Sequence, residues 1–367
     1  MAERRQEGRR ILLVLGTSTG GVGRHVRMLA AGFADTGHRV VVAGPRATED
    51  AFGFTGAGAV FAEVPISERP SPAGDVRAVA ALRRLARGAD VVHAHGLRAG
   101  ALAGLARTLP VRSTGTPLVV TLHNARTAGG AVGAVFAALE RVVAATATTV
   151  LAVSPDLAAR MAALGAPRVG HAVVPAPPLR PPARTPAEVR AELGLAPGRP
   201  LLLTIARLAQ QKGLETLLDA AASARSGALF AIAGDGPLRE PLRRRIEADK
   251  LPVALLGDRG DVPDLLAAAD AVVVASRWEG QPLSVQEALR AGRPIVATDV
   301  GGLPAMVADG AGLLVPYGDA AALRDAVDRV LADPALARAL SEAAARRGRN
   351  LPGERKAAAS ALTAYGL

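Results

Sequence analysis

The chain reads IARLAQQKG at residues 205–213, IAGDGP at residues 232–237 and SRWEGQPLSVQEALRAGRPIVATDVGG at residues 276–302. Each stretch lies where a short apolar run gives way to glycine and charged residues, and each is followed by apolar residues at helical spacing. Apolar runs that alternate with helical stretches are typical of βαβ units around a parallel sheet that is covered on both faces. The three stretches therefore predict an α/β domain with charged residues in its loops and helix starts.

The same alternation runs through the whole chain and predicts two domains. At 367 residues the chain exceeds what one hydrophobic core usually supports, given about 150 residues per domain. The stretch PAPPLRPPARTP at residues 175–186 can form neither a helix nor a central strand, so it is the expected linker. We expect an α/β fold of two Rossmann-like, doubly wound domains at residues 1–177 and 178–367, facing each other across a cleft. The last residues are expected to pack back on the first domain.

The expected elements follow from the apolar pattern. In the first half, helices are expected at residues 24–35 and 75–87, and strands at residues 11–15, 39–43, 91–95, 118–122 and 149–154. In the second half, strands are expected at residues 200–205, 228–233, 253–256, 271–275, 294–297 and 312–315.

Composition and hydropathy argue against a membrane-spanning, exported or disulfide-bonded protein. Half of the residues are apolar and the mean hydropathy is +0.24, but the longest uncharged runs, such as residues 128–139, are shorter than the ~20 residues of a membrane-spanning helix. The Arg-rich start is similar to the head of a signal peptide, yet the apolar run after it is only a strand long. The absence of Cys excludes disulfide bonds and thiol chemistry. We therefore expect a cytoplasmic protein that is not exported.

The net charge of +11 is unevenly distributed. Residues 1–175 contain 20 Lys and Arg against 11 Asp and Glu, whereas residues 176–367 contain 24 against 22, and all six His lie in the first part. A basic first domain favours an anionic partner such as an acidic lipid surface, nucleic acid or a phosphorylated molecule. The alternative is codon bias toward Arg, because only three of the 44 basic residues are Lys. The sequence leaves both explanations open.

Arg207 and Lys212 follow the strand expected at residues 200–205, just before a helix that begins at Gly213. An Arg fork can bind two phosphate oxygens, a Lys supplies a compact charge, and the start of a helix has free N–H groups. The pair can therefore neutralise a diphosphate. By itself, such a pair is usually solvated surface.

Glu279 and Glu287 are separated by seven residues in the third stretch. A carboxylate suits a diol because it only accepts hydrogen bonds and can receive two O–H groups. The alternative for Glu287 is structural, since Ser284 and Glu287 have the spacing of a capping box that would occupy this carboxylate with backbone N–H groups.

Two further groups lie in the first half. Gly20, Gly21 and Gly23 lie between a strand and a helix, where backbone N–H groups could approach a phosphate or sugar, although a simple tight turn explains them equally well. His123 ends one strand, and His95 and His93 end its neighbour. A His at the end of a strand more often has a structural role than a catalytic one. At the mouth of a doubly wound sheet, His123 is nevertheless the strongest candidate for a catalytic group, followed by His95 and then His93.

The chain resembles the retaining family-4 glycosyltransferases of the GT-B fold over nearly its whole length. The resemblance is carried by RLAQQKG at Arg207, by WEGQPLSVQEAL around Glu279 and Glu287, and by GGVGRH near the start. One departure is Gln281, because the family often has an aromatic residue after the Glu-Gly pair.

The resemblance implies an enzyme that moves a sugar from a UDP- or GDP-sugar to an acceptor hydroxyl, lipid-linked or phosphorylated. It implies catalytic roles for His123, Arg207, Lys212 and Glu279. It also implies donor contacts by Gly280, Gln281, Leu283 and Glu287 and by the glycines of the first loop. No metal is expected, because Arg, Lys and helix starts meet the phosphate charge.

Two other functions stay open at this point. An epimerase or hydrolase of nucleotide sugars can have the same fold, since fold alone does not fix chemistry. A basic nucleic-acid-binding protein is disfavoured, because the nine aromatic residues are scattered and no recognised binding module is present. We therefore expect no nucleic acid partner and, at most, peripheral attachment to an anionic inner membrane face.

Overall fold

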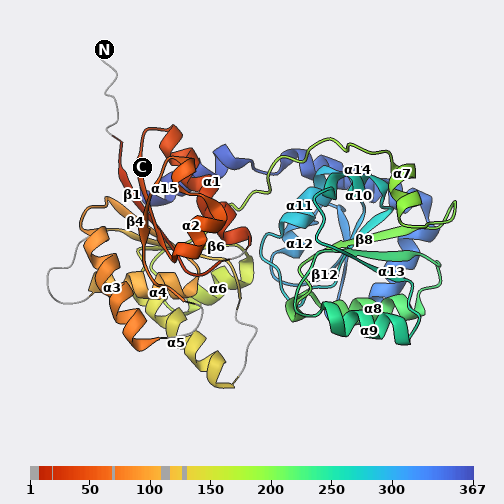
Figure 1. Cartoon of the computed structure of the whole chain (residues 1–367), viewed down its shortest axis with the longest axis horizontal. Helices are drawn as coiled ribbons and strands as arrows, with labels where there is room; N and C mark the ends of the chain where they lie inside the picture. Colours follow the sequence, from red (N-terminus) through yellow and green to blue (C-terminus); the bar gives the residue numbers. More distant parts are fainter. Residues whose placement is uncertain (1–7, 19, 68–70, 109–115, 126–129) are drawn as a thin grey trace, which may run out of the picture. The chain divides into compact units, whose positions relative to one another are not determined.

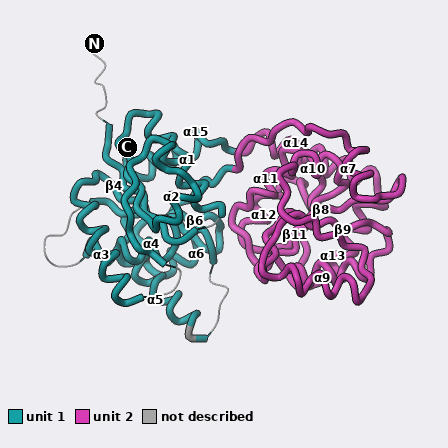
Figure 2. Tube along the Cα trace, in the orientation of Figure 1, with its two compact units in different colours: residues 1–175, 352–367 teal, residues 176–351 magenta. Residues whose placement is uncertain are grey.

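The computed structural model describes residues 8–18, 20–67, 71–108, 116–125 and 130–367, which form two compact units (Figure 2). The first unit combines Met1–Pro175 with Pro352–Leu367, and the second is Ala176–Leu351. The division falls within the proline-rich stretch. The Arg-rich start at residues 1–7, on which the expectation about export rests, lies outside the described residues.

The first unit is built on a parallel sheet in the strand order β3-β2-β1-β4-β5-β6-β7. Its central strands are runs of Val, Leu and Ala with buried side chains, as a sheet covered on both faces requires. The strands are β1 (Arg10–Leu15), β2 (Arg39–Gly44), β3 (Val60–Glu63), β4 (Val91–His95), β5 (Leu118–Leu122), β6 (Thr149–Ala152) and β7 (Val169–His171). The helices between them are α1 (Gly21–Asp35), α2 (Arg46–Phe52), the 3₁₀ helix η1 (Thr55–Ala57), α3 (Pro72–Ala86), α4 (Leu97–Thr108), α5 (Gly130–Thr146) and α6 (Pro155–Ala163) (Figure 1).

The last helix of the chain, α15 (Glu354–Tyr365), belongs to the first unit although it follows the second in sequence. It packs on α1, where a side chain at Gly32 would come within 3.1 Å of the Cβ of Ala358. The rings of Phe33 and Tyr365 lie 5.8 Å apart at the same contact. Small and aromatic residues thus fix α15 against α1, and the carboxyl terminus lies in the first unit (Figure 1).

The second unit repeats the plan with a parallel sheet in the order β10-β9-β8-β11-β12-β13. Leu201 and Leu203 pack in one hydrophobic cluster and Leu202 in another, so alternate strand residues face opposite helical layers. The strands are β8 (Leu201–Ile205), β9 (Leu229–Ala233), β10 (Val253–Gly257), β11 (Ala271–Val274), β12 (Ile295–Thr298) and β13 (Gly312–Val315). The helices are α7 (Pro186–Glu192), the 3₁₀ helix η2 (Gln210–Lys212), α8 (Leu214–Ser223), α9 (Arg239–Ala248), α10 (Val262–Ala268), α11 (Leu283–Arg290), α12 (Leu303–Met306), α13 (Ala320–Ala332) and α14 (Pro334–Asn350).

Each sheet reverses its strand order once, between β1 and β4 in the first unit and between β8 and β11 in the second. At such a point the loops that follow the two strands run in opposite directions and leave room for a ligand at the carboxyl ends of the strands. The loops after β1, β4, β8 and β11 are therefore where a site is expected within each unit.

Every strand predicted from the sequence is present, and two strands were missed. β3 and β7 are short strands whose side chains are half-buried or exposed, so they lack the apolar run that identifies the others. Both lie at the two edges of the first sheet, where burial is incomplete.

Candidate functional site

The loops after β8 and β11 in the second unit are joined directly to each other. The backbone N–H of Arg277 donates to the carbonyl of Gln211 (2.8 Å), and the Gln211 side-chain amide donates to the carbonyl of Trp278 (2.9 Å). Gly213 has φ +59°, and a Cβ there would lie 2.0 Å from the Ala275 carbonyl oxygen. Only glycine permits this approach, so the glycine of the QQKG turn sets the position of the preceding Lys212.

Lys212 and Glu279 form an ion pair across these two loops. The Lys212 ammonium lies 2.6 Å from Oε1 of Glu279, and the Ser276 hydroxyl donates to the same oxygen, also at 2.6 Å. The Glu279 side chain is 8% exposed and that of Lys212 is 22% exposed. Among the described residues no group donates to Oε2 of Glu279. One carboxylate oxygen therefore fixes the pair, while the other is available to a ligand hydroxyl.

A third segment, the end of β12 and the loop after it, is hydrogen-bonded to the backbone of Glu279 and Ser276. The N–H of Gly302 donates to the Glu279 carbonyl (2.8 Å), and the Thr298 hydroxyl donates to the Ser276 carbonyl (2.6 Å). At Gly301, with φ +56°, a Cβ would lie 2.1 Å from the Glu279 carbonyl oxygen. The Gly-Gly turn at the end of the third stretch thus fixes the backbone that carries the acid.

Arg207 lies on the same loop as Lys212 but is exposed. Its guanidinium has no hydrogen bond or ion pair to any described residue, so all of its donors are available. Of the two basic residues predicted to meet a diphosphate, Arg207 is thus the unpaired one, and Lys212 shares its charge with Glu279.

The proposed capping box at Ser284 and Glu287 does not form. Helix α11 begins at Leu283 with Pro282 as its N-cap and no side-chain cap, which places Ser284 inside the first turn. The capping-box alternative for Glu287 is therefore wrong, because the helix starts two residues earlier than a capping box requires. Glu287 is half-buried one turn into the helix, and Gly280, Gln281 and Leu283 form the turn that leads to it.

The glycine loop of the first unit divides into two parts. At Gly20 and Gly21, at the start of α1, no atom of a described residue other than chain neighbours and the helix's own backbone lies within 4 Å of where a Cβ would be. Gly23 instead packs against the ring of Phe52, which a Cβ would meet at 2.1 Å, and its N–H donates to the Ser18 hydroxyl (3.2 Å). These contacts give Gly23 a packing role and leave Gly20 and Gly21 as the glycines that a ligand could approach.

His123, directly after β5, lies beside the two histidines of β4. Its Nε2 is 3.2 Å from Nδ1 of His95, and burial lowers the pKa of His123 to about 4. His93 is fully enclosed, with its ring nitrogens 2.7 Å from the Thr121 hydroxyl and 2.6 Å from the Tyr365 hydroxyl. Burial lowers the pKa of His93 to about 3. His93 is thus committed to protein contacts, whereas half-buried His123 can also meet a ligand.

Several residues of these sites gave little signal in the sequence. Ser276 and Gln211 support Glu279 through contacts that connect separate loops, and Tyr365 is 272 positions from His93. His25 lies inside the quoted GGVGRH motif, but only the fold brings it to His95 and His123. Sequence spacing alone cannot identify partners that are this distant.

The residue types of Asp258, Asp261 and Asp264, which follow a strand, predict a solvated loop and a helix cap. Asp261 is the N-cap of α10 but makes no side-chain cap bond, so the capping role is wrong. Asp261 and buried Asp264 pair with Arg184 and hold the end of the linker. Within the described residues, no group of three or more His, Asp or Glu could hold a metal ion.

The second-unit site combines an exposed cation, a cation and carboxylate pair, and the uncapped starts of α8 and α11 at one end of a parallel sheet. Such a site can bind an anionic group through Arg207 and the N–H groups, and a hydroxyl through Oε2 of Glu279. The first unit offers open glycines and a group of uncharged imidazoles.

Comparison with known proteins finds two family models that together cover most of the chain. The glycosyl transferases group 1 model matches residues 187–347, and the glycosyl transferase 4-like domain model matches residues 20–177. The alpha-D-kanosaminyltransferase of Streptomyces kanamyceticus is 33% identical over 276 residues, which are 69% of this chain and 71% of the relative. The D-inositol 3-phosphate glycosyltransferase of Nocardia farcinica is 32% identical over 66% of this chain and 59% of its own length. Among solved structures, Anabaena Alr3699/HepE in complex with UDP has a TM-score of 0.81 at 20% identity, covering 98% of this chain and 100% of that one.

Proposed function

The chain belongs to the group 1 glycosyl transferases and has their GT-B fold, and we propose that it transfers a sugar from a nucleoside-diphosphate sugar to an acceptor hydroxyl with retention at the anomeric carbon. The observation that carries this proposal is the Lys212 and Glu279 pair beside the unpaired Arg207. A nucleoside-diphosphate sugar presents a diphosphate and a set of hydroxyls, and this site offers a partner to each.

Arg207 and Lys212 stabilise the departing diphosphate in this proposal. Lys212 uses one N–H for Glu279 and retains two for phosphate oxygens, while the Arg207 fork binds the others. Charge on the leaving group grows in the transition state, so these contacts strengthen as the bond breaks. A diphosphate oxygen on the same face takes the acceptor proton, which is why no separate general base is required.

Glu279 and Glu287 position the donor. Oε2 of Glu279 accepts from a sugar hydroxyl, and Glu287 on α11 accepts from the ribose hydroxyls of the nucleotide. Gly280, Gln281 and Leu283 line the turn between them. We also propose Gly20, Gly21 and His123 as residues that contact the donor. The nucleotide in this proposal is uridine or guanosine diphosphate; the Anabaena structure of the same fold contains UDP. Activity without a metal follows if Arg207, Lys212 and the helix starts supply the positive charge.

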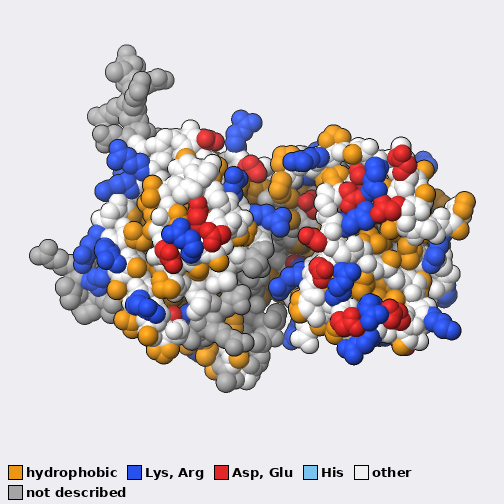
Figure 3. Space-filling model, in the orientation of Figure 1, with side chains coloured by type: hydrophobic (Ala, Val, Ile, Leu, Met, Phe, Trp, Pro, Cys, Tyr) orange, Lys and Arg blue, Asp and Glu red, His pale blue; other side chains and the backbone are white. Residues whose placement is uncertain are grey.

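We propose that the acceptor binds to the first unit, that it is lipid-linked or phosphorylated, and that it is reached at an anionic inner membrane face. Helix α3 exposes Arg77 and Arg84, and exposed Arg87 follows its last residue as the C-cap. In the second unit, by contrast, basic and acidic side chains are interspersed on the face drawn in Figure 3. Each basic residue near an acidic bilayer contributes on the order of 1 kcal/mol, so a few give reversible binding.

An apolar contact would add to this charge. The first turns of α5 expose Val132 (56%), Val135 (44%) and Phe136 (38%), and residues 130–139 carry no charge. No helix of the described residues is both long enough and apolar enough to span a bilayer. Our proposal is therefore peripheral binding through these basic and apolar side chains, by an enzyme that we place in the cytoplasm.

A panel of nucleotide sugars tests the function. We expect one UDP- or GDP-sugar to raise the melting temperature and to yield, with its acceptor, a product whose anomeric proton shows retained configuration by NMR. No stabilisation by any nucleotide sugar at millimolar concentration, or an inverted product, would contradict the proposal.

Vesicle co-sedimentation tests the membrane contact. The protein should pellet with anionic but not neutral vesicles, and less at high salt. Replacement of Arg77, Arg84 and Arg87 by Gln should release it, whereas Arg244→Gln in the second unit should not. If the protein fails to pellet with both kinds of vesicle, the membrane proposal is wrong and a soluble acceptor is favoured.

A further inference from the structure

Four of the six histidines gather in the first unit around the point where its strand order reverses. They come from α1 (His25), from β4 (His93 and His95) and from the loop after β5 (His123). The ring centroids of His25, His95 and His123 are 5.5, 5.6 and 5.5 Å apart, so the three imidazoles form a nearly regular triangle. Burial, the main cause in each case, and the neighbouring imidazoles keep the pKa of His25 and of His95 well below its usual range. All three rings are therefore uncharged at neutral pH.

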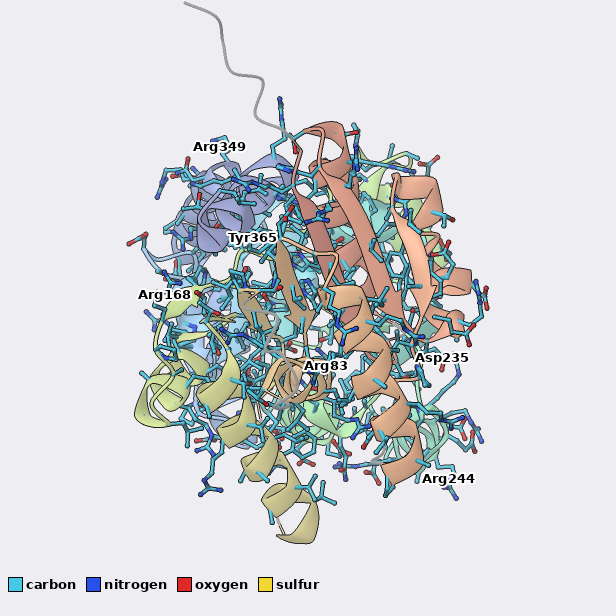
Figure 4. The ribbon with its side chains drawn as sticks, turned by 90° about the vertical axis from the view of Figure 1, so that its left-hand side faces the viewer. Arg83, Arg168, Asp235, Arg244, Arg349 and Tyr365 are labelled. Atoms are coloured by element: carbon cyan, nitrogen blue, oxygen red, sulfur yellow. The ribbon has the colours of Figure 1, made fainter. Side chains whose placement is uncertain are left out.

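His93 anchors this group to the last helix of the chain. Its ring lies 4.1 Å from that of His95, and both of its nitrogens have hydroxyl partners, from Thr121 and from Tyr365 of α15. Figure 4 shows Tyr365 next to the strands of this unit. Burial raises the pKa of Tyr365 well above its ordinary value, so the hydroxyl keeps its proton. Both ring nitrogens of His93 are therefore hydrogen-bonded, and neither is available to a ligand.

His95 differs from His93, because its Nε2 is buried and has no hydrogen-bond partner among the described residues. Its Nδ1 faces Nε2 of His123 at 3.2 Å, and one of these two nitrogens must donate to the other. A neutral imidazole carries one N–H. If the proton were on Nε2 of His95, a buried N–H would lack an acceptor, which is rarer and more costly than an unpaired lone pair.

The proton therefore belongs on Nδ1 of His95, which donates to Nε2 of His123. Since Nε2 of His123 is then an acceptor, the single proton of His123 lies on its Nδ1. This nitrogen has no partner among the described residues and is not one of the buried unpaired atoms.

We propose that His95 is a positioning residue that holds His123 as the neutral Nδ1–H tautomer, so that His123 presents a hydrogen-bond donor to the ligand. The proposal rests on the proposed function, in which His123 contacts the donor sugar. It assigns His123 the role of donating to a sugar oxygen, and it excludes His123 as the group that removes the acceptor proton. The shared proton, rather than the charge of the ring, is what His95 controls.

The tautomer can be measured without any assay of activity. In protein labelled with ¹⁵N at histidine, the shifts and two-bond couplings of the imidazole nitrogens distinguish the two tautomers. At neutral pH we expect His123 with its proton on Nδ1. A His123 proton on Nε2 in the wild-type protein overturns the proposal.

Three variants separate positioning from packing. His95→Leu removes the group that donates to Nε2 of His123, so we expect His123 to populate both tautomers. We also expect kcat to fall at least ~10-fold, which corresponds to the loss of about one hydrogen bond. His95→Asn restores an N–H near the position of Nδ1 and should recover both. Tyr365→Phe removes a hydroxyl from the same group of residues but leaves the bond between His95 and His123, so the His123 tautomer should be retained and kcat should stay within ~3-fold of wild type.

Two outcomes contradict the proposal. An unchanged His123 spectrum in His95→Leu means that His95 does not set the tautomer. A change in Tyr365→Phe as large as that in His95→Leu means that general packing sets it. If the wild-type protein transfers no sugar, the spectra still decide the tautomer, so failure of the proposed function is distinguishable from failure of this inference.

Discussion

Replacing Lys212 by Met should destabilise the second unit as well as slow turnover. Met retains the apolar stem of Lys212 but removes the ammonium that lies 2.6 Å from Oε1 of Glu279. The carboxylate that remains is 8% exposed and retains only the Ser276 hydroxyl as a donor to that oxygen. A buried charge that loses its counter-charge is among the few single changes with a large effect on stability.

The size of the effect follows from the geometry. At an effective dielectric constant of about 20, unit charges about 2.6 Å apart attract by roughly 6 kcal/mol. Removal of one partner from a buried pair typically costs about 3–5 kcal/mol, and the 22% exposure of Lys212 lets water reach the acid, which favours the low end. We expect a loss of about 3 kcal/mol, or about 6–12 °C in the melting temperature of a unit of this size.

The sole tryptophan provides the assay. Trp278 precedes Glu279 and is buried, so its fluorescence during urea unfolding reports on the second unit alone. Glu279→Gln should cost about 1 kcal/mol, because the remaining Lys212 can be solvated. The double variant should be more stable than Lys212→Met, with a coupling energy of about 2 kcal/mol, yet should remain at least ~10-fold slower than wild type. A Lys212→Met protein as stable as wild type, or strictly additive effects, would refute the reasoning.

Four further results are expected. Arg207→Ala should lower turnover at least ~10-fold with an unchanged melting temperature, because its guanidinium has no partner among the described residues; an unchanged rate would remove it from the donor site. Glu287→Gln should weaken nucleoside diphosphate binding in calorimetry, while Ser284→Ala, which removes no cap, should not change stability; the reverse pattern would favour the capping alternative. Turnover should survive EDTA, and activity that is lost and then restored by Mg²⁺ or Mn²⁺ would contradict the metal-free proposal. The imidazoles of His93 and His123, with pKa values of about 3 and about 4 against an ordinary 6.5, bind fewer protons in the folded than in the unfolded protein. Stability should therefore be full above about pH 6.5 and fall as the pH drops toward 4, and proton uptake on unfolding at pH 5, measured by calorimetry in two buffers, should be positive.

Local pattern was sufficient for most of the fold. Apolar runs such as Val91–His95 and Leu118–Leu122 identify strands that are buried on both faces, because only a covered parallel sheet tolerates continuous apolar strands. β3 and β7 escaped prediction because edge strands are incompletely buried and carry no such run.

The candidate site was predictable to the level of residue types and loops. Arg207, Lys212 and Glu279 were identified from loop position and motif spacing, and the structure brings Lys212 to Glu279 although 67 positions separate them. Their pairing was not predicted, because two loops that follow different strands meet only after the sheet has formed its strand order. The same limit explains the capping box, since the S-x-x-E spacing fits but the backbone begins the helix at Leu283.

Periodicity and turn chemistry are properties of neighbouring residues, so the apolar pattern was enough to predict the main strands and the charged loops between them. Which of those residues contact one another depends on the folded chain. Tyr365 contacts His93 across 272 positions, and His25 joins His95 and His123, because α15 returns to the first unit and α1 packs over the strand switch. The physical reason is that the protonation of a buried imidazole and the charge balance of a buried carboxylate depend on neighbours in space, and the chain order does not record those neighbours.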